Sequence, residues 1–377
     1  MASKPRVLLG MSGGVDSSVS AILLLEQGYE VIGGFMKNWS DIAVETDRGQ
    51  QESQVLGRDP SLAECSWRTE RRDAMRVAAQ LGIEFHTFDF EADYRRLVYE
   101  YMIAEYKAGR TPNPDVLCNK YMKFDLFLQE ADKLGCDFVA TGHYARIAHP
   151  PLDKGGERGV GNSRMFAGVD ANKDQSYFLC QLTQPQLKRV LFPIGELEKT
   201  QVRDIAHKHG LVVADKKDSQ GICFVGKVDM QDFLEARIQP HAGNIVTTSG
   251  EIIGEHRGFE FYTIGQRGGL GVGGGTPYYV VERRPETNEV IVAVGDEDPA
   301  LFKSELVATN LTETVEGNFT KYADQKIVAR IRYRQPLAAC TFDGSKVVFD
   351  QPQRAVAPGQ FIAFYVKDEL IGSGVIA

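Results

Sequence analysis

The alternation of apolar and polar positions over roughly the first 150 residues predicts a parallel sheet covered by helices. Four apolar runs of strand length stand at 6–9, 30–36, 84–88 and 137–141. Between the third and fourth runs, two apolar stripes recur at helical spacing: Tyr94, Leu97, Val98, Tyr101 and Met102, and then Phe124, Phe127, Leu128 and Ala131. Strands that alternate with amphipathic helices are typical of α/β domains. We expect both stripes to belong to the hydrophobic core.

The pattern changes twice further along the chain. A stretch rich in Pro, Gly and charge at 148–164 predicts a surface loop, and helical spacing resumes through Val202, Ile205 and Ala206. From about residue 243, short β-branched and aromatic runs alternate with turn residues, which predicts strands at 326–333, 346–349, 361–366 and 370–376 and a hairpin at Asp343-Gly344. We therefore expect an α/β domain over 1–220, a small central domain over 221–295 and a C-terminal β-barrel over 296–377.

Composition narrows the class of protein. The 377 residues are 43% hydrophobic and 25% charged, as in ordinary globular proteins, and leave room for two or three domains. The net charge of −8 excludes a global basic field, so any RNA-binding surface must be local. The sequence shows no run long enough to span a membrane and no secretory signal, and its six cysteines form no CxxC pair. We expect a cytoplasmic protein in a reducing compartment, without a membrane partner.

A glycine-rich loop between the first strand and a helix predicts an anion site. It reads Ser12-Gly13-Gly14-Val15-Asp16-Ser17-Ser18, and the glycines let backbone N–H groups approach a phosphate at the positive end of the helix dipole. The alternative is an ordinary turn in which Ser17 or Asp16 caps the helix. No Lys follows the loop as in a Walker A sequence, which disfavours simple γ-phosphate hydrolysis. The loop instead resembles the PP-loop of ATP pyrophosphatases, which cleave between the α- and β-phosphates.

A second glycine cluster is rejected as a dinucleotide site. Residues 269–274 formally match GxGxxG, but Thr276-Pro277 and a β-like segment follow where a dinucleotide fingerprint requires a helix. We interpret the cluster as a flexible loop.

The segment around Cys118 carries a candidate reactive thiol. It reads Thr111-Pro112-Asn113-Pro114-Asp115-Val116-Leu117-Cys118-Asn119-Lys120. Two prolines stiffen the loop, and a helix N-terminus together with Lys120 is expected to lower the pKa of the Cys118 thiol. Asp115 is close enough in sequence to act as a general acid or base. The alternative is a rigid turn followed by a small buried Cys.

The remaining polar clusters leave alternatives open. Lys216 and Lys217 precede Cys223 and favour either a thiolate or a bound polyanion, while Ile222 and Phe224 favour a core Cys. For Cys65, Cys136, Cys180 and Cys340 we expect structural roles. The seven histidines show no zinc-binding spacing, so no protein-bound transition metal is expected. Strand alternation would place Arg330, Arg332 and Arg334 on one face, either as an RNA-backbone patch or as a solvated face.

With these pieces in place, the chain resembles the bacterial tRNA-specific 2-thiouridylases of the MnmA type over nearly its whole length. Eight blocks carry the resemblance in the same order: 10–18, 35–39, 109–120, 140–146, 173–179, 221–224, 262–267 and 332–335. The stretches at 42–60 and 148–164 are where the family is expected to vary.

The resemblance implies the site residues and their partners. ATP, accompanied by Mg²⁺, would be bound by Gly10, Met11, Ser12, Gly13, Gly14, Val15, Asp16, Ser17, Met36 and Gly142. Asn113, Pro114 and Asp115 would approach the target base, and tRNA would contact His143, Lys173, Asp174, Gln175, Arg332, Tyr333 and Gln360. Cys118 matches the nucleophile and Cys223 the persulfide carrier, with a transient disulfide between them. The sulfur would come from a persulfide donor, either a cysteine desulfurase or a sulfur-relay protein.

The implied reaction is 2-thiolation of the wobble uridine, position 34, of tRNA. The C2 oxygen of uridine is a poor leaving group, so ATP first adenylates it, and persulfide sulfur then displaces AMP. Two other hypotheses remain: an ATP-dependent ligase or amidating enzyme acting on a small molecule, and a non-catalytic RNA-binding protein with a degenerate nucleotide site.

Overall fold

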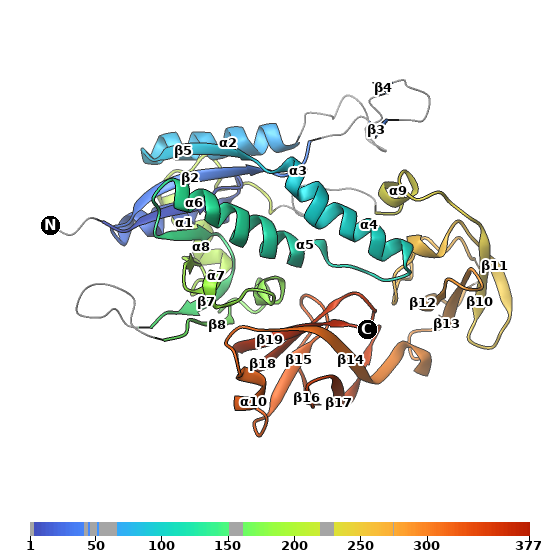
Figure 1. Ribbon diagram of the computed structural model, residues 1–377. Helices are drawn as coiled ribbons and strands as arrows, with labels where there is room; N and C mark the ends of the chain where they lie inside the picture. The colour runs from blue at the N-terminus through green and yellow to red at the C-terminus, as the bar shows by residue number, and fades with distance from the viewer. Residues whose placement is uncertain are drawn as a thin grey trace.

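The computed structural model describes residues 4–40, 44–45, 51–52, 66–150, 161–218, 230–273 and 275–377. Its N-terminal part is built on a five-stranded sheet in the order β5-β2-β1-β6-β9, in which every neighbouring pair is parallel (Figure 1). The strands are β1 (Arg6–Gly10), β2 (Glu30–Lys37), β5 (Glu84–Asp89), β6 (Phe138–Thr141) and β9 (Val190–Leu191). The four predicted strands are confirmed within one residue at each end, and β9 was not predicted. A separate two-stranded pair consists of β3 (Val44–Glu45) and β4 (Gln51–Glu52).

Helices cover both faces of this sheet, because its strands are apolar on both sides. One face packs against α1 (Val15–Glu26), α2 (Ser66–Leu81) and α8 (Lys199–Lys208). The other packs against two helical runs: α3 (Glu91–Tyr94), the π-helical η2 (Arg95–Tyr99) and α4 (Glu100–Lys107), then α5 (Pro114–Leu117), the π-helical η3 (Cys118–Leu126) and α6 (Phe127–Lys133). Both predicted apolar stripes lie on these two runs, in or against the hydrophobic core, as expected. Two short elements follow, η4 (Ser176–Leu179) and α7 (Gln184–Leu187).

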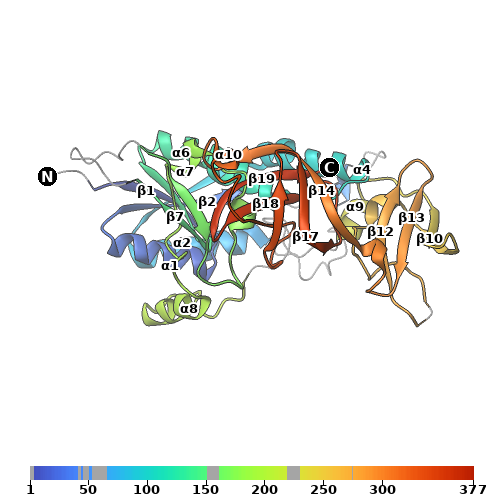
Figure 2. The same ribbon diagram turned by 90° about the horizontal axis from the view of Figure 1, so that it is seen from below.

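A four-stranded sheet in the order β11-β10-β13-β12 forms the central part of the chain. Its elements are α9 (Met230–Glu235), β10 (Gly243–Thr247), β11 (Ile252–His256), η5 (Phe259–Phe261), β12 (Tyr278–Arg284) and β13 (Glu289–Val294). Figures 1 and 2 place this sheet at the opposite end of the molecule from the N-terminus. The rejection of a dinucleotide fingerprint at 269–274 is confirmed where the structure describes it, because the strand β12 follows the loop.

The C-terminal part is a closed six-stranded barrel, as expected. Strand β14 pairs with β17 on one side and with β19 on the other, which closes the ring β14-β17-β16-β15-β18-β19. The elements are η6 (Pro299–Leu301), β14 (Phe302–Glu313), α10 (Asn318–Lys321), β15 (Ile327–Arg330), β16 (Ala338–Phe342), β17 (Lys346–Arg354), β18 (Phe361–Val366) and β19 (Glu369–Ile376). The hairpin at Asp343-Gly344 joins β16 to β17, with Gly344 at a φ of 100°. Barrel closure leaves no free sheet edge on these strands.

One predicted strand is too long, and this changes the position of three arginines. The segment 326–333 is a strand only as β15, because the Ile331 N–H donates to the side chain of Gln335 at 2.9 Å instead of to a neighbouring strand. Arg330 is therefore a buried strand residue, while Arg332 and Arg334 are exposed on the turn that follows. The prediction that Arg330, Arg332 and Arg334 share one strand face is wrong.

The barrel sheet continues into the N-terminal domain. Strands β7 (Ala145–Ala148) and β8 (Arg164–Ala167) form a hairpin around the predicted surface loop, and β8 pairs with β19. Residues 151–160 of that loop lie outside the described residues. The two domains thus share one sheet. Within the described ranges, no helix has the length and hydrophobicity needed to cross a membrane.

Candidate active site

The glycine loop leads directly into the first turn of α1. Gly14 is the N-cap residue of this helix, and in the described structure no side chain supplies a capping hydrogen bond. The Ser17 and Ser18 hydroxyls instead donate to the Gly14 carbonyl oxygen, at 3.1 and 2.8 Å. The alternative of a turn capped by Ser17 or Asp16 is therefore wrong. The first N–H groups of a helix have no partner within the helix and point outward, as a phosphate site requires.

Three glycines in and around the loop allow close packing against its neighbours. Gly13 has a φ of 74°, and a Cβ atom there would lie 2.2 Å from the Glu70 carbonyl oxygen. A Cβ on Gly142, directly after β6, would lie 2.7 Å from the Ser17 backbone nitrogen. Gly10 similarly faces the Met36 side chain, 3.2 Å from the position of a Cβ. The structure thus brings the predicted nucleotide-binding residues of β1, β2, α1 and β6 together at the carboxyl edge of the sheet.

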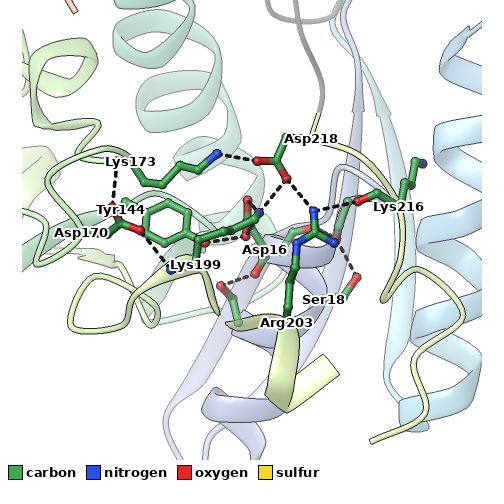
Figure 3. A network of polar contacts seen from close by, with 12 residues as sticks. Asp16, Ser18, Tyr144, Asp170, Lys173, Lys199, Arg203, Lys216 and Asp218 are labelled. Carbon is green, nitrogen blue, oxygen red and sulfur yellow. Dashed lines mark hydrogen bonds and ion pairs between the residues drawn. The ribbon is translucent and has the colours of Figure 1, made fainter. Parts of the chain in front are cut away.

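An ion-pair network surrounds Asp16, the acidic residue of the loop (Figure 3). Lys199 of α8 donates to both Asp16 carboxylate oxygens, at 2.7 and 2.9 Å, and the Tyr144 hydroxyl donates to Asp16 at 2.8 Å. Burial and then the Asp16 charge raise the pKa of Tyr144, so its phenol stays protonated as a donor. Asp16 is thereby fixed in one orientation at the start of α1.

The network continues to Asp218. Lys199 also lies 2.7 Å from an Asp218 oxygen, and Lys173 lies 2.6 Å from the other. Burial on its own raises the pKa of Asp218, but the hydrogen bonds from Lys173 and Lys199 outweigh it and lower the pKa overall. Asp218 is therefore a carboxylate shared by Lys199, which lies at the glycine loop, and Lys173, a predicted tRNA contact.

The candidate nucleophile lies on the helical run α5-η3-α6. Asn113 is the N-cap residue of α5, and its side chain accepts the Val116 N–H at 3.2 Å, with Pro114 at the first helical position. Cys118 follows four residues after Pro114 and is fully buried in the core. The Lys120 ammonium donates to Gln181 at 3.1 Å, and burial lowers the pKa of this lysine. The expected lowering of the Cys118 pKa stays a prediction.

His143 connects this run to the nucleotide edge. Its Nε2 lies 3.4 Å from the Lys123 ammonium, and its Nδ1 lies 2.6 Å from the Thr141 hydroxyl. Burial, followed by the Lys123 charge, lowers the pKa of His143 well below its ordinary value. The ring is therefore neutral at physiological pH. Because His143 is buried, a direct contact with tRNA requires a conformational change that exposes its side chain.

Most of the predicted tRNA contacts gather where the N-terminal domain meets the barrel. The Phe178 and Tyr333 rings lie with their centroids 4.6 Å apart, and Tyr177 donates to the Phe361 carbonyl at 3.0 Å. Gln175 accepts the Tyr144 N–H at 3.1 Å, and Gln360 donates to the backbone of the Asn113 loop. Arg332 is exposed there, while the partly exposed Lys173 side chain points to Asp218 in the network near the glycine loop.

Asp174 differs from the other predicted contacts. Its carboxylate lies 3.0 Å from the Arg330 guanidinium and accepts the N–H groups of Gly168 and Ser176, each at 3.0 Å. The side chain is 3% exposed. Asp174 therefore links the barrel, through Arg330, to the segment that carries Lys173 and Gln175.

The other cysteines fit structural roles where the structure describes them. Burial raises the pKa of Cys136, and raises those of Cys180 and Cys340 to about 12, which fits inert thiols. Cys65 and Cys223 lie outside the described residues. Within the described ranges, no group of three His, Cys, Asp or Glu side chains is arranged to hold a metal ion.

Three residues of the site were not singled out from the sequence as site residues: Lys199, Asp218 and Tyr144. Tyr144 lies in the 140–146 block and Asp218 directly follows the lysine pair at 216–217, so both lay beside a recognisable signal. Lys199 had none, because its partner Asp16 is 183 residues away in the chain.

Three family models cover the chain in order. The tRNA methyl transferase HUP domain matches residues 5–227, the tRNA methyl transferase PRC-barrel domain matches 231–294, and the aminomethyltransferase beta-barrel domain matches 308–376. The structure of NMN synthetase from Francisella tularensis overlaps 56% of this chain and 66% of its own, at 15% identity and a TM-score of 0.31, which is too distant a likeness to bear on function.

Full-length relatives share one name, tRNA-specific 2-thiouridylase MnmA. The protein of Flavobacterium johnsoniae is 43% identical, covering 99% of this chain and 100% of the relative. Those of Pseudomonas fluorescens and Bacillus licheniformis are each 45% identical, covering 99% and 100% of this chain and 95% and 96% of the relatives. With this identity over the whole length, and with a glycine loop suited to ATP, the chain belongs to the family of tRNA-specific 2-thiouridylases.

Proposed function

We propose that this protein transfers sulfur to C2 of the wobble uridine, position 34, of tRNA, through an adenylated uridine and a cysteine persulfide. The family supplies the reaction class, 2-thiouridylation of tRNA with ATP. The reaction needs a phosphate site, reactive thiols and a surface for tRNA. The residues of this chain that suit these needs lie at the glycine loop, on the helical run of Cys118 and where the barrel meets the N-terminal domain.

The main support for this proposal is that the glycine loop and Cys118 lie at the same edge of the sheet. Gly142 abuts the Ser17 backbone, and the next residue, His143, lies 3.4 Å from Lys123 on η3. Cys118 begins that helical segment, roughly one turn before Lys123. A base activated at the loop would therefore lie on the side of the sheet where Cys118 begins η3, and the reaction requires the buried Cys118 thiol to become accessible to it.

Adenylation uses the glycine loop. The uridine C2 oxygen attacks the α-phosphorus of ATP, the bond to the β-phosphate breaks, and pyrophosphate leaves. Backbone N–H groups at the start of α1 hold the phosphates, with Met36 and Gly142 beside the adenosine. Mg²⁺ chelated by the phosphates would neutralise part of their charge, and it needs only one or two carboxylates. Asp16 is the loop carboxylate suited to supply one.

Sulfur transfer uses the two cysteines. In one route, the terminal sulfur of a Cys223 persulfide attacks C2 and AMP leaves, after which Cys118 attacks the Cys223 sulfur and releases the thiouridine. In the other, Cys118 attacks the Cys223 sulfur of the persulfide first, which breaks the S–S bond and releases sulfide, and the sulfide then attacks C2 so that AMP leaves. Both routes leave a Cys118–Cys223 disulfide, which a thiol reductant must reduce before the next turnover. Asp115, about one turn of helix before Cys118, would act as the general acid or base and take the proton of the Cys118 thiol.

The residues that would bind tRNA lie at the start of α5 and on the neighbouring surface. Asn113 and Pro114 at the start of α5 would approach the flipped-out base, because an unstacked anticodon base fits a pocket. Lys173, Gln175, Arg332 and Tyr333 would contact the tRNA backbone beside it. A cysteine desulfurase or sulfur-relay protein would load Cys223. In this proposal, residues 1–220 form the catalytic domain, residues 221–295 a central domain and residues 296–377 the barrel.

Nucleoside mass spectrometry tests the proposal. Unmodified tRNA is incubated with the protein, ATP, Mg²⁺ and a persulfide-generating system, and 2-thiouridine is measured for the unaltered chain, Cys118→Ala, Cys223→Ala and the control Cys340→Ala. We expect thiolation to be lost in the first two variants only, while both still release pyrophosphate in the presence of tRNA. Pyrophosphate release that needs neither tRNA nor the cysteines would instead support a ligase acting on a small molecule.

The HUP domain family that matches this chain is named for a tRNA methyl transferase, and methyl transfer is a different reaction from sulfur transfer. Glycines at the N-terminus of a helix favour a phosphate ligand, which ATP supplies. A methylated uridine formed without 2-thiouridine, in the same assay with a methyl donor added, would contradict the proposed sulfur transfer.

A further inference from the structure

We infer that Lys199 and Lys216 bind the β- and γ-phosphates of ATP, and the pyrophosphate that leaves, so that the cations missing from the glycine loop come from another part of the chain. This inference rests on the proposed function and deepens it. The loop at 12–18 contains no lysine or arginine, and a helix N-terminus contributes only about half a positive charge. A diphosphate group carries several negative charges and needs more than this.

Lys199 is held at the loop by the acidic residues around it. It is the first residue of α8, its side chain is 13% exposed, and its ammonium lies 2.7 Å from oxygens of both Asp16 and Asp218. Its backbone N–H donates to Asp170 at 3.0 Å, which fixes the start of the helix. The ammonium therefore lies directly beside the first turn of α1, where the loop ends (Figure 3).

Lys216 reaches the same loop from a different segment. Its ammonium donates to the Gly13 carbonyl oxygen at 3.0 Å and to Asp73 at 2.7 Å. Arg203 of α8 holds this segment in place, donating to the Ala214 carbonyl at 2.9 Å and to the Lys216 carbonyl at 3.3 Å. Two ammonium groups thus flank the loop, one at Gly13 and the other at Asp16.

Exchange of these lysines from carboxylate to phosphate is energetically accessible. The side chains of Asp16, Asp218 and Asp73 are between 17% and 33% exposed, so water can solvate these carboxylates when the lysines leave them. Tyr144 remains a partner of Asp16, and Arg203 remains 3.5 Å from Asp218. A phosphate offers more charge and more acceptor oxygens than a single carboxylate. Rotation of a lysine side chain is sufficient to change partner, so the bonds to Asp16 and Asp73 hold the ammonium groups close to the position that they would take in the complex.

Equilibrium binding to the full chain without tRNA tests this. ATP, inorganic pyrophosphate and AMP are titrated onto the unaltered protein, Lys199→Met, Lys216→Met, Lys199→Arg and Lys208→Met. Lys208 is exposed at the other end of α8 and serves as the matched control. AMP keeps the adenosine and the α-phosphate, so its affinity also reports whether the loop remains folded in each variant.

We expect each Met variant to lose about tenfold or more in affinity for ATP and pyrophosphate but less than about twofold for AMP, with Lys199→Arg retaining most of the ATP affinity. Unchanged ATP affinity in both Met variants would overturn the inference. An equal loss for AMP and ATP would also overturn it, because it would assign the lysines a structural role only. If the unaltered chain bound no ATP, the proposed function itself would fall.

Discussion

Gln360 of the barrel and Asn113 of the N-terminal domain hydrogen-bond each other, with the Asn113 amide nitrogen 3.2 Å from the Gln360 side-chain oxygen. The Gln360 amide also donates to the carbonyls of Thr111 and Pro112, at 3.0 and 3.1 Å. Two residues that the family resemblance assigns to tRNA thus hold the loop at residues 111–113 to the barrel. Because Asn113 caps α5, the position of the helix that carries Cys118 depends on a residue more than two hundred positions away.

Gln360→Ala is therefore expected to impair the use of tRNA more than the use of ATP. It removes three hydrogen bonds, each contributing about 1 kcal/mol, from a loop that must be ordered for the reaction. We expect kcat/KM for tRNA thiolation to fall on the order of tenfold to a hundredfold, with ATP affinity unchanged. Steady-state kinetics with each substrate varied in turn measures this. Gln325→Ala, exposed on the same barrel, should behave like the unaltered chain.

A second prediction concerns the buried ion pair of Arg330 and Asp174. Arg330→Met leaves the Asp174 carboxylate buried without its cation, which typically costs about 3–5 kcal/mol. The double variant Arg330→Met/Asp174→Asn removes both charges, so it should be more stable than Arg330→Met alone. Urea unfolding followed by fluorescence gives the order. If the double variant were the less stable of the two, the burial of an unpaired charge would not be the cause of the loss.

The architecture could be predicted from the sequence because its signals are local. Strand-length apolar runs, helical stripes and the Asp343-Gly344 turn each depend on neighbours within a few residues, and they correctly predicted the parallel sheet, its helices and the barrel. The glycine loop was recognisable for the same reason, since its strand, turn and helix are contiguous.

Contacts between distant segments could not be predicted in this way. The hairpin β7-β8 joins the barrel through Met165 and Leu370, and nothing in either segment indicates its partner. Lys199 is similar, since only the folded chain places it beside Asp16. The misplacement of Arg332 had another cause: a single hydrogen bond to the Gln335 side chain ends the strand two residues before it. Cys118 was recognised as a candidate, but its full burial depends on the tertiary core.

The buried His143 gives a pH dependence of stability. Its pKa lies well below the ordinary value of 6.5, so below pH 6.5 the unfolded chain binds more protons at this residue than the folded chain does. The free energy of unfolding therefore rises with pH in this range: the contribution is complete above pH 6.5 and is lost as the pH falls toward the folded pKa.

We expect His143→Asn to flatten this dependence, removing on the order of 1 kcal/mol from the rise in unfolding free energy between pH 5 and about 7.5. Urea unfolding at several pH values across this range measures the slope. His207→Asn, at the exposed end of α8, is the control. A slope that is the same in His143→Asn and in the unaltered chain would show that other groups, such as the buried His256, cause the dependence.

The close approach of Gly142 to the glycine loop gives the last prediction. A methyl group at this position would lie 2.7 Å from the Ser17 nitrogen and 2.8 Å from the Asp16 carbonyl carbon, both of them backbone atoms that cannot rotate away. Gly142→Ala must therefore displace the first turn of α1 and the N–H groups that would hold phosphate. We expect ATP affinity to fall about tenfold or more while tRNA binding is retained, because the predicted tRNA contacts lie mostly at the barrel interface. Equilibrium binding of each ligand checks this, with Gly268→Ala as control, since a Cβ there meets no atom within 4 Å. ATP affinity equal to that of the unaltered chain would mean that the loop moves without cost or that phosphate is held elsewhere.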